Sequence, residues 1–154
     1  MASAPSGAMS TFAEELRQRT FNYALRVLAF CRQFPDTFEG REIAKQLLRA
    51  GMGTSSNYWS ACRGRSPDEF IARLGVAEDE AAESVMWLML TIRGGIRGDT
   101  AAKELLQEGR EITAILSTSH KTAKENRRRN KAQAKRQLTK LPTSPLTKST
   151  EAPP

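Results

Sequence analysis

Residues 66–92 read SPDEFIARLGVAEDEAAESVMWLMLTI and contain the clearest structural signal in this chain. Ser66 is a suitable helix N-cap, Pro67 suits the first helical position, and Glu69 follows the cap by three residues. Over residues 70–92, apolar and small residues then recur at helical spacing, which places them on one face. The stretch therefore predicts a helix that begins at Pro67.

Three further segments show the same periodicity. Residues 12–34 form a first helix that ends before a proline turn, because proline disfavours helical geometry in the residue before it. Residues 41–62 form the second, and residues 101–119, which Thr100 can cap, form the fourth after a glycine-rich loop. We therefore expect an all-α fold, an up-down antiparallel four-helix bundle of residues 12–120.

The second predicted helix has more apolar surface than one bundle contact needs. It carries one seam through Leu47 and Tyr58 and another through Met52 and Trp59. This wide face indicates either a helix central to its own bundle or a contact with another subunit. In the third helix, residues 85–90 are apolar on every side, so that end needs enclosure by the bundle or by a partner. The expected oligomer interface comprises Met52, Trp59, Trp87 and Met89.

Gly51 and Gly53 lie inside the second predicted helix, where each glycine costs about 1 kcal/mol relative to alanine. Close approach of a neighbouring backbone would justify that cost. A phosphate-binding loop is the competing interpretation, but no strand precedes these glycines and no Gly-Lys-Ser/Thr sequence follows them. We therefore expect the glycines to serve packing.

The net charge of +7 is concentrated near the C-terminus. Residues 1–120 contain 14 basic and 15 acidic residues, whereas residues 121–154 contain 10 basic and 2 acidic ones. Because residues 121–154 have few large apolar groups, we expect a disordered basic tail there, and a disordered N-terminus at residues 1–11. A merely solubilising terminus is the plainer interpretation of the tail; an arm that binds the phosphates of RNA or DNA is the sharper one.

Basic residues also occur between the second and third predicted helices. Lys45 and Arg49 are one helical turn apart, and Arg63 and Arg65 flank a glycine in the turn. If they meet at one end of the bundle they form a basic patch, and otherwise they are ordinary solvated side chains. The candidate nucleic-acid-binding residues are Lys45, Arg49, Arg63, Arg65, Arg73, Arg127, Arg128, Arg129, Lys131, Lys135 and Arg136.

The sequence offers little material for catalysis. His120 is the only histidine, and Cys31 and Cys62 lack the spacing of metal or redox sites. A Cys-His pair and a Glu-x-x-His di-metal centre are therefore not expected, and residues 78–83 are interpreted as a solvated acidic face or a subunit contact. Because no nucleotide-binding motif is present, we expect a non-enzymatic protein without a metal or another cofactor.

The longest apolar run is too short to cross a bilayer, and the N-terminal residues do not resemble a signal peptide. We therefore expect a soluble, cytoplasmic protein with no membrane partner.

Residues 47–92, together with the turn before the second helix, resemble the bacterial four-helix-bundle proteins related to those encoded by intervening sequences in 23S ribosomal RNA genes. The resemblance covers roughly residues 12–116 and implies an up-down bundle with no known catalytic activity. The matching residues are Phe34, Pro35, Gln46, Leu47, Arg49, Ala50, Ser56, Asn57, Tyr58, Ala61, Ser66, Glu69, Phe70, Glu80, Glu83, Trp87 and Leu88.

The same resemblance extends to the accessory protein of diversity-generating retroelements, a basic homopentameric barrel that works with a reverse transcriptase and RNA. It implies a homo-oligomer, with a pentamer favoured, and a reverse transcriptase as a partner. This chain departs from that protein, because its positive charge lies in the tail and its folded part is about neutral.

Two hypotheses follow from the sequence. The first is an oligomeric, non-enzymatic bundle that binds nucleic acid, RNA more than DNA, through phosphate electrostatics. The second is a protein–protein interaction scaffold with no nucleic-acid role, in which Trp59, Trp87 and Met89 contact the partner.

Overall fold

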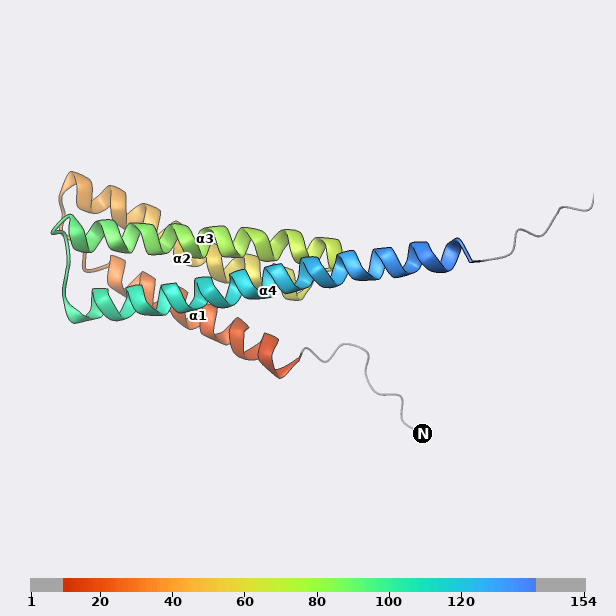
Figure 1. The fold of residues 1–154 in the computed structure, drawn as a ribbon. Coiled ribbons are helices and arrows are strands. Elements are labelled where there is room, and N and C mark those ends of the chain that lie inside the picture. Colours follow the sequence, from red (N-terminus) through yellow and green to blue (C-terminus); the bar gives the residue numbers. More distant parts are fainter. Residues whose placement is uncertain (1–9, 141–154) are drawn as a thin grey trace, which may run out of the picture.

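The structure, a computed structural model, describes residues 10–140 and forms one bundle of four helices in that range. Successive helices run antiparallel and are joined by short turns (Figure 1). This arrangement confirms the predicted all-α four-helix bundle. The helices are α1 (Thr11–Cys31), α2 (Phe38–Cys62), α3 (Pro67–Arg93) and α4 (Thr100–Leu138).

Each helix begins at a residue whose side chain accepts a backbone hydrogen bond. The predicted cap of α3 is confirmed, since Ser66 Oγ accepts from the Glu69 N–H at 3.1 Å. The predicted cap of α4 is wrong by one residue: Asp99 Oδ1 accepts from the Ala102 N–H at 2.9 Å, and Thr100 is the first helical residue. A carboxylate there also complements the positive end of the helix dipole. The caps of α1 and α2 are Ser10 and Thr37.

The core runs along the bundle and uses the seams that the periodicity predicted. The buried hydroxyl group of Tyr23 has a partner, because Tyr23 Oη lies 2.8 Å from Ser84 Oγ, in a hydrogen bond between α1 and α3. The largest fully buried side chains with an apolar body are Tyr23, Leu47, Leu74, Leu88, Leu105, Ile112, Leu116 and Val27.

The two interior glycines of α2 have different neighbours. A Cβ on Gly51 would lie 2.8 Å from Val27 Cγ1, so this glycine lets α2 approach α1 closely. A Cβ on Gly53 would instead lie 2.6 Å from the carboxyl carbon of Glu80 on α3. The expected packing role is therefore confirmed for Gly51, where the neighbour is a rigid β-branched side chain in the core.

The helices do not pack equally. α2 lies between α1 and α3, whereas α1 has few contacts with α4 and diverges from it toward the α1 N-terminus (Figure 1). Across this weaker contact, Arg19 Nε lies 2.7 Å from Glu108 Oε1, and Arg19 Nη2 lies 2.5 Å from Glu111 Oε2. An ion pair thus supplements apolar contact between α1 and α4.

Part of the apolar surface that the sequence singled out stays exposed in this single subunit. The second seam of α2 faces α1 in part, but Met52 remains 47% exposed. On α3, Met86 and Leu90 are 46% and 44% exposed, so the bundle does not enclose the whole apolar run of residues 85–90. An uncovered apolar strip of this kind is typical of a protein contact.

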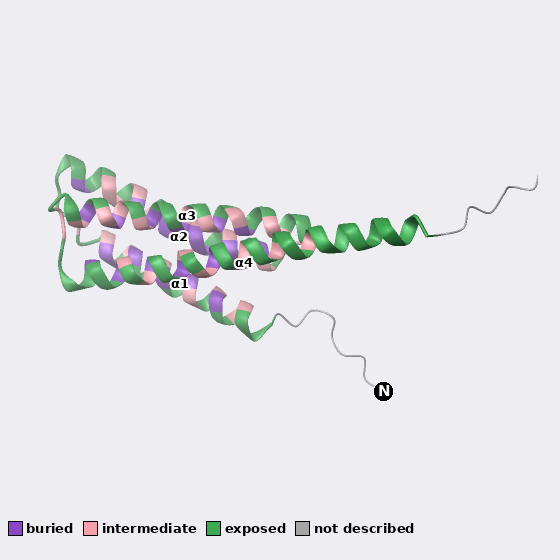
Figure 2. Ribbon diagram, viewed as in Figure 1, coloured by how far each residue is buried: buried purple, intermediate pink, exposed green. Residues whose placement is uncertain are grey.

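The structure corrects the expectation of disorder immediately after the bundle. α4 continues as a helix to Leu138, although residues 128–138 are exposed (Figure 2). These residues are mainly good helix formers with no Gly or Pro, and they extend a packed helix, so no nucleation cost opposes them. The expectation of disorder over residues 1–11 is likewise wrong at its end, since Ser10 caps α1 and Thr11 is its first residue. Residues 1–9 and 141–154, on which the other expectations of disorder fall, lie outside the described residues.

Candidate nucleic-acid interface

The extension of α4, residues 121–138, is called the α4 arm below. It contains eight basic residues and one acidic residue, Glu125. All of these charged residues are exposed except Arg127, which is half-buried. The arm is thus a cationic helix that stands clear of the bundle over its last turns.

Five of these cations form a row along one face of the arm. Spacings of three, four, three and four residues place them together at 3.6 residues per turn. At 1.5 Å per residue the row is about 21 Å long. The cationic row consists of Lys121, Lys124, Arg128, Lys131 and Lys135.

The arm is attached to α3 through Asp68. Arg127 Nε donates to Asp68 Oδ1 at 2.8 Å and Arg127 Nη2 donates to Asp68 Oδ2 at 2.6 Å, a two-pronged contact. Lys131 Nζ lies 3.7 Å from Asp68 Oδ1. The hydrogen bond from Arg127 holds the pKa of the Asp68 carboxyl below its ordinary value. Asp68 is therefore charged at neutral pH and marks the level at which the arm leaves the bundle.

A second contact lies two turns earlier, where His120 Nδ1 is 2.7 Å from Glu78 Oε2. A Cβ on Gly75 would lie 2.9 Å from His120 Cε1, so this glycine makes room for the imidazole against α3. Burial raises the pKa of Glu78, but hydrogen bonds from His120 and Ser117 outweigh burial and leave the pKa below its ordinary value. α4 is thus tied to α3 on both sides of residue 123.

The turn between α2 and α3 lies at the same end of the bundle as the arm (Figure 1). Arg63 and Arg65 are in this turn and Arg73 is in the second turn of α3, and all three are exposed. The structure therefore brings these arginines to the end from which the arm projects. It places Arg73 on the side of α3 that faces α2, away from the arm, because its position matches that of Glu80 two turns later, beside Gly53.

Lys45 and Arg49 are not at this end. They are exposed on the outer face of α2, and Arg49 precedes Arg63 by 14 residues, or about 21 Å of helix. One basic patch containing all five candidate residues of the folded domain is therefore not assembled within the subunit. The candidates that share one end of the bundle are the turn arginines and the residues of the arm: Arg127, Arg128, Arg129, Lys131, Lys135 and Arg136.

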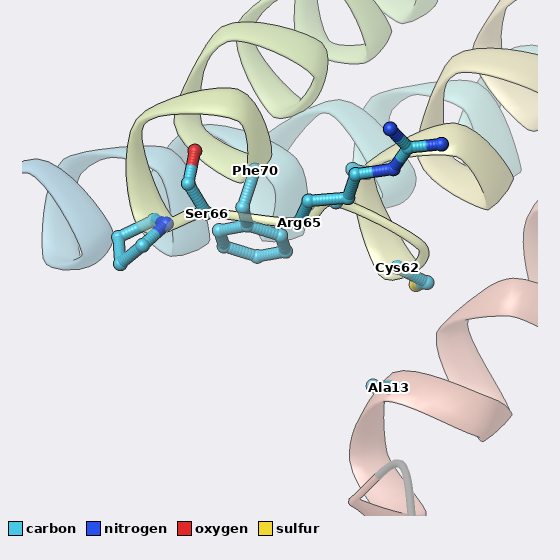
Figure 3. A pocket seen from close by; sticks show the side chains of 8 residues that line it. Ala13, Cys62, Arg65, Ser66 and Phe70 are labelled. Atoms are coloured by element: carbon cyan, nitrogen blue, oxygen red, sulfur yellow. The ribbon is translucent and has the colours of Figure 1, made fainter. Parts of the chain in front are cut away.

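A cavity of about 480 Å³ opens between the start of α1 and the turn that follows α2. Figure 3 shows Cys62, Arg65 and Phe70 around it, with Ala13 on the facing helix. Burial raises the pKa of the Cys62 thiol, which disfavours the reactive thiolate. The lining is mainly small and apolar, and it includes no acid–base pair.

The expected oligomer-interface residues lie in three different settings. Met52 and Trp59 line a groove of about 360 Å³ between α1 and α2, together with Phe21, and the Arg17 guanidinium lies 4.7 Å from the centre of the Trp59 ring. Trp87 is half-buried and donates from Nε1 to Glu83 Oε1 at 3.0 Å. Met89, also half-buried, lies elsewhere on α3.

Sequence reasoning missed several residues of this arrangement. It chose arm residues by the density of Arg and Lys, and so omitted Lys121 and Lys124, which the spacing of three and four would have found. The role of Asp68 was not predicted, because no sequence pattern links it to Arg127, which lies 59 positions later. The same holds for Phe21, which completes the groove.

Across residues 10–140, no three His, Cys, Asp or Glu side chains are grouped so that they could hold a metal ion. Within the same residues, no helix combines the length and apolar character needed to span a membrane.

Comparison with known proteins places this geometry in a family. No curated protein matches the chain. A crystal structure of a protein of unknown function from the S23 ribosomal protein family of Bacteroides thetaiotaomicron VPI-5482 is similar, with 24% identity, a TM-score of 0.66, and coverage of 71% of this chain and 97% of that one. That similarity shows the shared fold. The family model for the 23S rRNA-intervening sequence protein matches residues 14–118, so the chain belongs to the 23S rRNA-intervening sequence protein family.

Proposed function

We propose that this protein is a non-enzymatic nucleic-acid-binding protein that contacts phosphates, those of RNA in preference, through the α4 arm. The observation that carries the proposal is an ordered, exposed helix with eight basic residues and one acidic residue. Such a surface has little apolar area to bury, so its binding free energy would come from counterion release at phosphates. The reference to 23S rRNA in the family description supports RNA over DNA.

A salt titration of RNA binding tests this proposal. The full chain is compared with a chain that ends at His120, whose fold is checked by circular dichroism. We expect the affinity of the full chain to fall steeply with salt, since six to ten phosphate contacts cost about 10³- to 10⁵-fold between 50 and 200 mM. Equal affinity and equal salt dependence for the shortened chain would exclude the arm as the binding element.

A matched pair of variants separates position from net charge. One variant replaces three residues of the cationic row, Lys124, Arg128 and Lys135, with Gln. The control replaces three exposed cations at the opposite end of the bundle with Gln, and these are Arg32, Arg93 and Lys103. We expect the row variant to lower the slope of log affinity against log salt by about 2 to 3, at about 0.7 to 0.9 per lost contact, and the control to leave it unchanged.

Self-association is the second part of the proposal. The exposed face of α2 combines basic and apolar residues at helical spacing, whereas that of α3 combines apolar and acidic ones. Because the two faces differ and are complementary in charge, they would pair head to tail between subunits and close into a ring. The α2 face comprises Lys45, Arg49, Met52, Ser56, Trp59 and Arg63, and the α3 face comprises Val76, Asp79, Glu83, Met86 and Leu90.

This pairing gives Lys45 and Arg49 a partner in place of phosphate, which their distance from the arm favours. Gly53 faces Glu80 within one subunit. Arg49 lies about one turn before Gly53 and Glu83 about one turn after Glu80, so in a ring whose axis is parallel to the helices these two residues meet at the same height. Five subunits is the number that the resemblance to the retroelement accessory protein implies.

Mass measurement by sedimentation tests the ring. We expect Met52→Glu to yield monomers, because it places a charge in the apolar part of the α2 face. The control Phe38→Glu changes an even more exposed side chain, 76% against 47%, outside that face, and is expected to keep the assembly. Arg49→Glu and Glu83→Arg should each weaken the assembly and restore it in combination. A monomeric parent protein would exclude self-association.

One observation favours the alternative of a protein-binding scaffold: the groove lined by Phe21, Met52 and Trp59 is apolar and open. A stable monomer without RNA affinity would support that alternative. The reverse transcriptase implied by the resemblance is tested separately, by co-purification with the full chain.

A further inference from the structure

The α4 arm lies outside the part of the chain that defines the family. The family model matches residues 14–118, whereas the arm begins at residue 121. Its structure is also not that of a flexible polycation, because it continues α4 without interruption (Figure 1). The arm is therefore a helical segment beyond the residues that the family model matches.

Two contacts fix the direction of the arm relative to the bundle. His120 meets Glu78 at 2.7 Å, and Arg127 meets Asp68 through two hydrogen bonds of 2.6 and 2.8 Å. Both acidic partners are on α3, so the arm follows the axis of α3 and then passes its first residue. Residues 128–138 consequently project as an exposed helix with a defined orientation.

The cations of the arm lie on two flanks. The cationic row occupies one, and Arg129 and Arg136 occupy another about one-third of a turn away. Asn130 and Ala134 lie on the remaining side, the same side as Arg127, which faces α3. The side of the arm that points away from α3 is therefore bordered by positive charge on both edges.

This distribution is typical of a helix that lies between two rows of phosphates. The arm is about 10 to 12 Å wide with its side chains, which suits the major groove of B-DNA, about 12 Å wide, or the wide minor groove of double-stranded RNA. A single strand offers one row of phosphates and is usually bound with aromatic side chains that stack on bases. Residues 121–138 contain no Phe, Tyr or Trp.

We propose that the α4 arm binds double-stranded nucleic acid as a preformed helix, with its two cationic flanks on the two phosphate rows that border a groove. This inference rests on the proposed function, since it specifies which nucleic acid the arm takes. Binding of a duplex would therefore require the helical conformation of the arm as well as its positive charge.

The test changes helicity while it keeps every charge. One variant carries Asn130→Gly and Ala134→Gly, on the side of the arm without the cationic flanks, and the control carries Asn130→Ala and Ala134→Gln, both good helix formers. Full-length proteins are titrated at fixed salt with an RNA duplex, a DNA duplex and a single-stranded RNA of equal nucleotide number. Circular dichroism verifies the loss of helix in the glycine variant.

We expect the glycine variant to lose about tenfold in affinity for its preferred duplex, because forming the helix on binding now costs free energy. Its affinity for the single strand, and all affinities of the control, should stay at the parent level. The two duplexes show which groove is used. Equal duplex affinity for the glycine variant and the parent would overturn this inference, even if deletion of the arm abolished binding. Equal affinity of the chain that ends at His120 would overturn the proposed function instead.

Discussion

The hydroxyl group of Tyr23 lies against Gly109 at the centre of the bundle, where a Cβ on residue 109 would come within 2.6 Å of the tyrosine oxygen. The same oxygen is 2.8 Å from Ser84 Oγ, so residues of α1, α3 and α4 meet at one buried polar atom. An interior glycine costs about 1 kcal/mol in a helix, and the contact that it permits offsets this cost. Gly109 is therefore the position at which α4 is brought close to α1.

We expect Gly109→Ala to lower the free energy of unfolding by about 2 kcal/mol, because overpacking outweighs the better helix propensity of alanine. Tyr23→Phe removes the clashing oxygen at a cost of about 1 kcal/mol for the lost hydrogen bond. The double variant should be less destabilised than the sum of the two single variants. The clash is relieved only in part, because Val85 Cγ2 would still lie 3.1 Å from the added Cβ. Urea denaturation measures the cycle, and strict additivity would contradict the proposed contact.

The glycines of α2 should respond in opposite ways. Gly51→Ala would push a methyl group to 2.8 Å from a γ-carbon of Val27, so we expect a loss of about 1 to 3 kcal/mol in unfolding free energy. Gly53→Ala meets only the flexible carboxyl end of Glu80, so we expect a neutral effect or a gain of up to about 1 kcal/mol. Thermal unfolding of the two variants side by side distinguishes them. Equal destabilisation would contradict this account of α2.

The helices were predictable because each has a periodic apolar face and a clear signal at its start or end. Ser66 and Glu69 fix the start of α3 through local hydrogen bonds, and Pro67 contributes its fixed backbone angle, so a sequence pattern captures this start. The end of α4 was not predicted, because residues 121–154 have few apolar groups to bury and this alone was taken to indicate disorder. A chain segment without apolar residues can still be helical when it extends a packed helix and consists of good helix formers.

The candidate site was predictable in chemistry and not in geometry. Density of Arg and Lys identified residues 127–136, but the partners of Arg127 come from α3 and depend on how the helices align. Lys45 and Arg49 illustrate the opposite error, because proximity in sequence to the turn does not bring them to its end of the bundle. In both cases the outcome depends on how the helices align along the bundle, and local sequence patterns do not reveal this alignment.

Arg97 connects the loop after α3 to the end of α1. Its guanidinium lies 4.2 Å from the centre of the Phe30 ring, Nη1 donates to the Phe30 carbonyl at 3.2 Å, and Nη2 lies 2.6 Å from Asp99 Oδ2. We expect Arg97→Lys to lower the unfolding free energy by about 1 kcal/mol, since lysine keeps the charge but cannot stack and donate in three directions. Urea denaturation measures this loss. An unchanged midpoint would show that charge alone is sufficient.

The contact between Asp68 and Arg127 should govern how well the arm keeps its helix. We expect Asp68→Asn to speed hydrogen exchange of the backbone amides in residues 121–131, because the neutral amide cannot replace the two-pronged ion pair. Asp79→Asn is the matched control. Asp79 is also an exposed acid on α3, but the ion pairs of the arm are with Asp68 and do not involve Asp79. Equal exchange in both variants would show that propensity alone holds the arm.

The pH dependence of the arm follows from the same contacts. Hydrogen bonding from Arg127 lowers the pKa of Asp68, and for Glu78 the contacts of His120 and Ser117 outweigh the effect of burial, so its pKa is lowered as well. A carboxyl group whose pKa is lower in the folded state stabilises that state above its unfolded pKa, about 4, and this stabilisation is lost as the pH falls through the lower folded value. We therefore expect the Cα chemical shifts of residues 121–131 to move from helical values toward coil as the pH falls below about 4. In Asp68→Asn, only the share of this change that depends on Glu78 should remain, and an arm that keeps its helix unchanged through this range would exclude both acids as anchors.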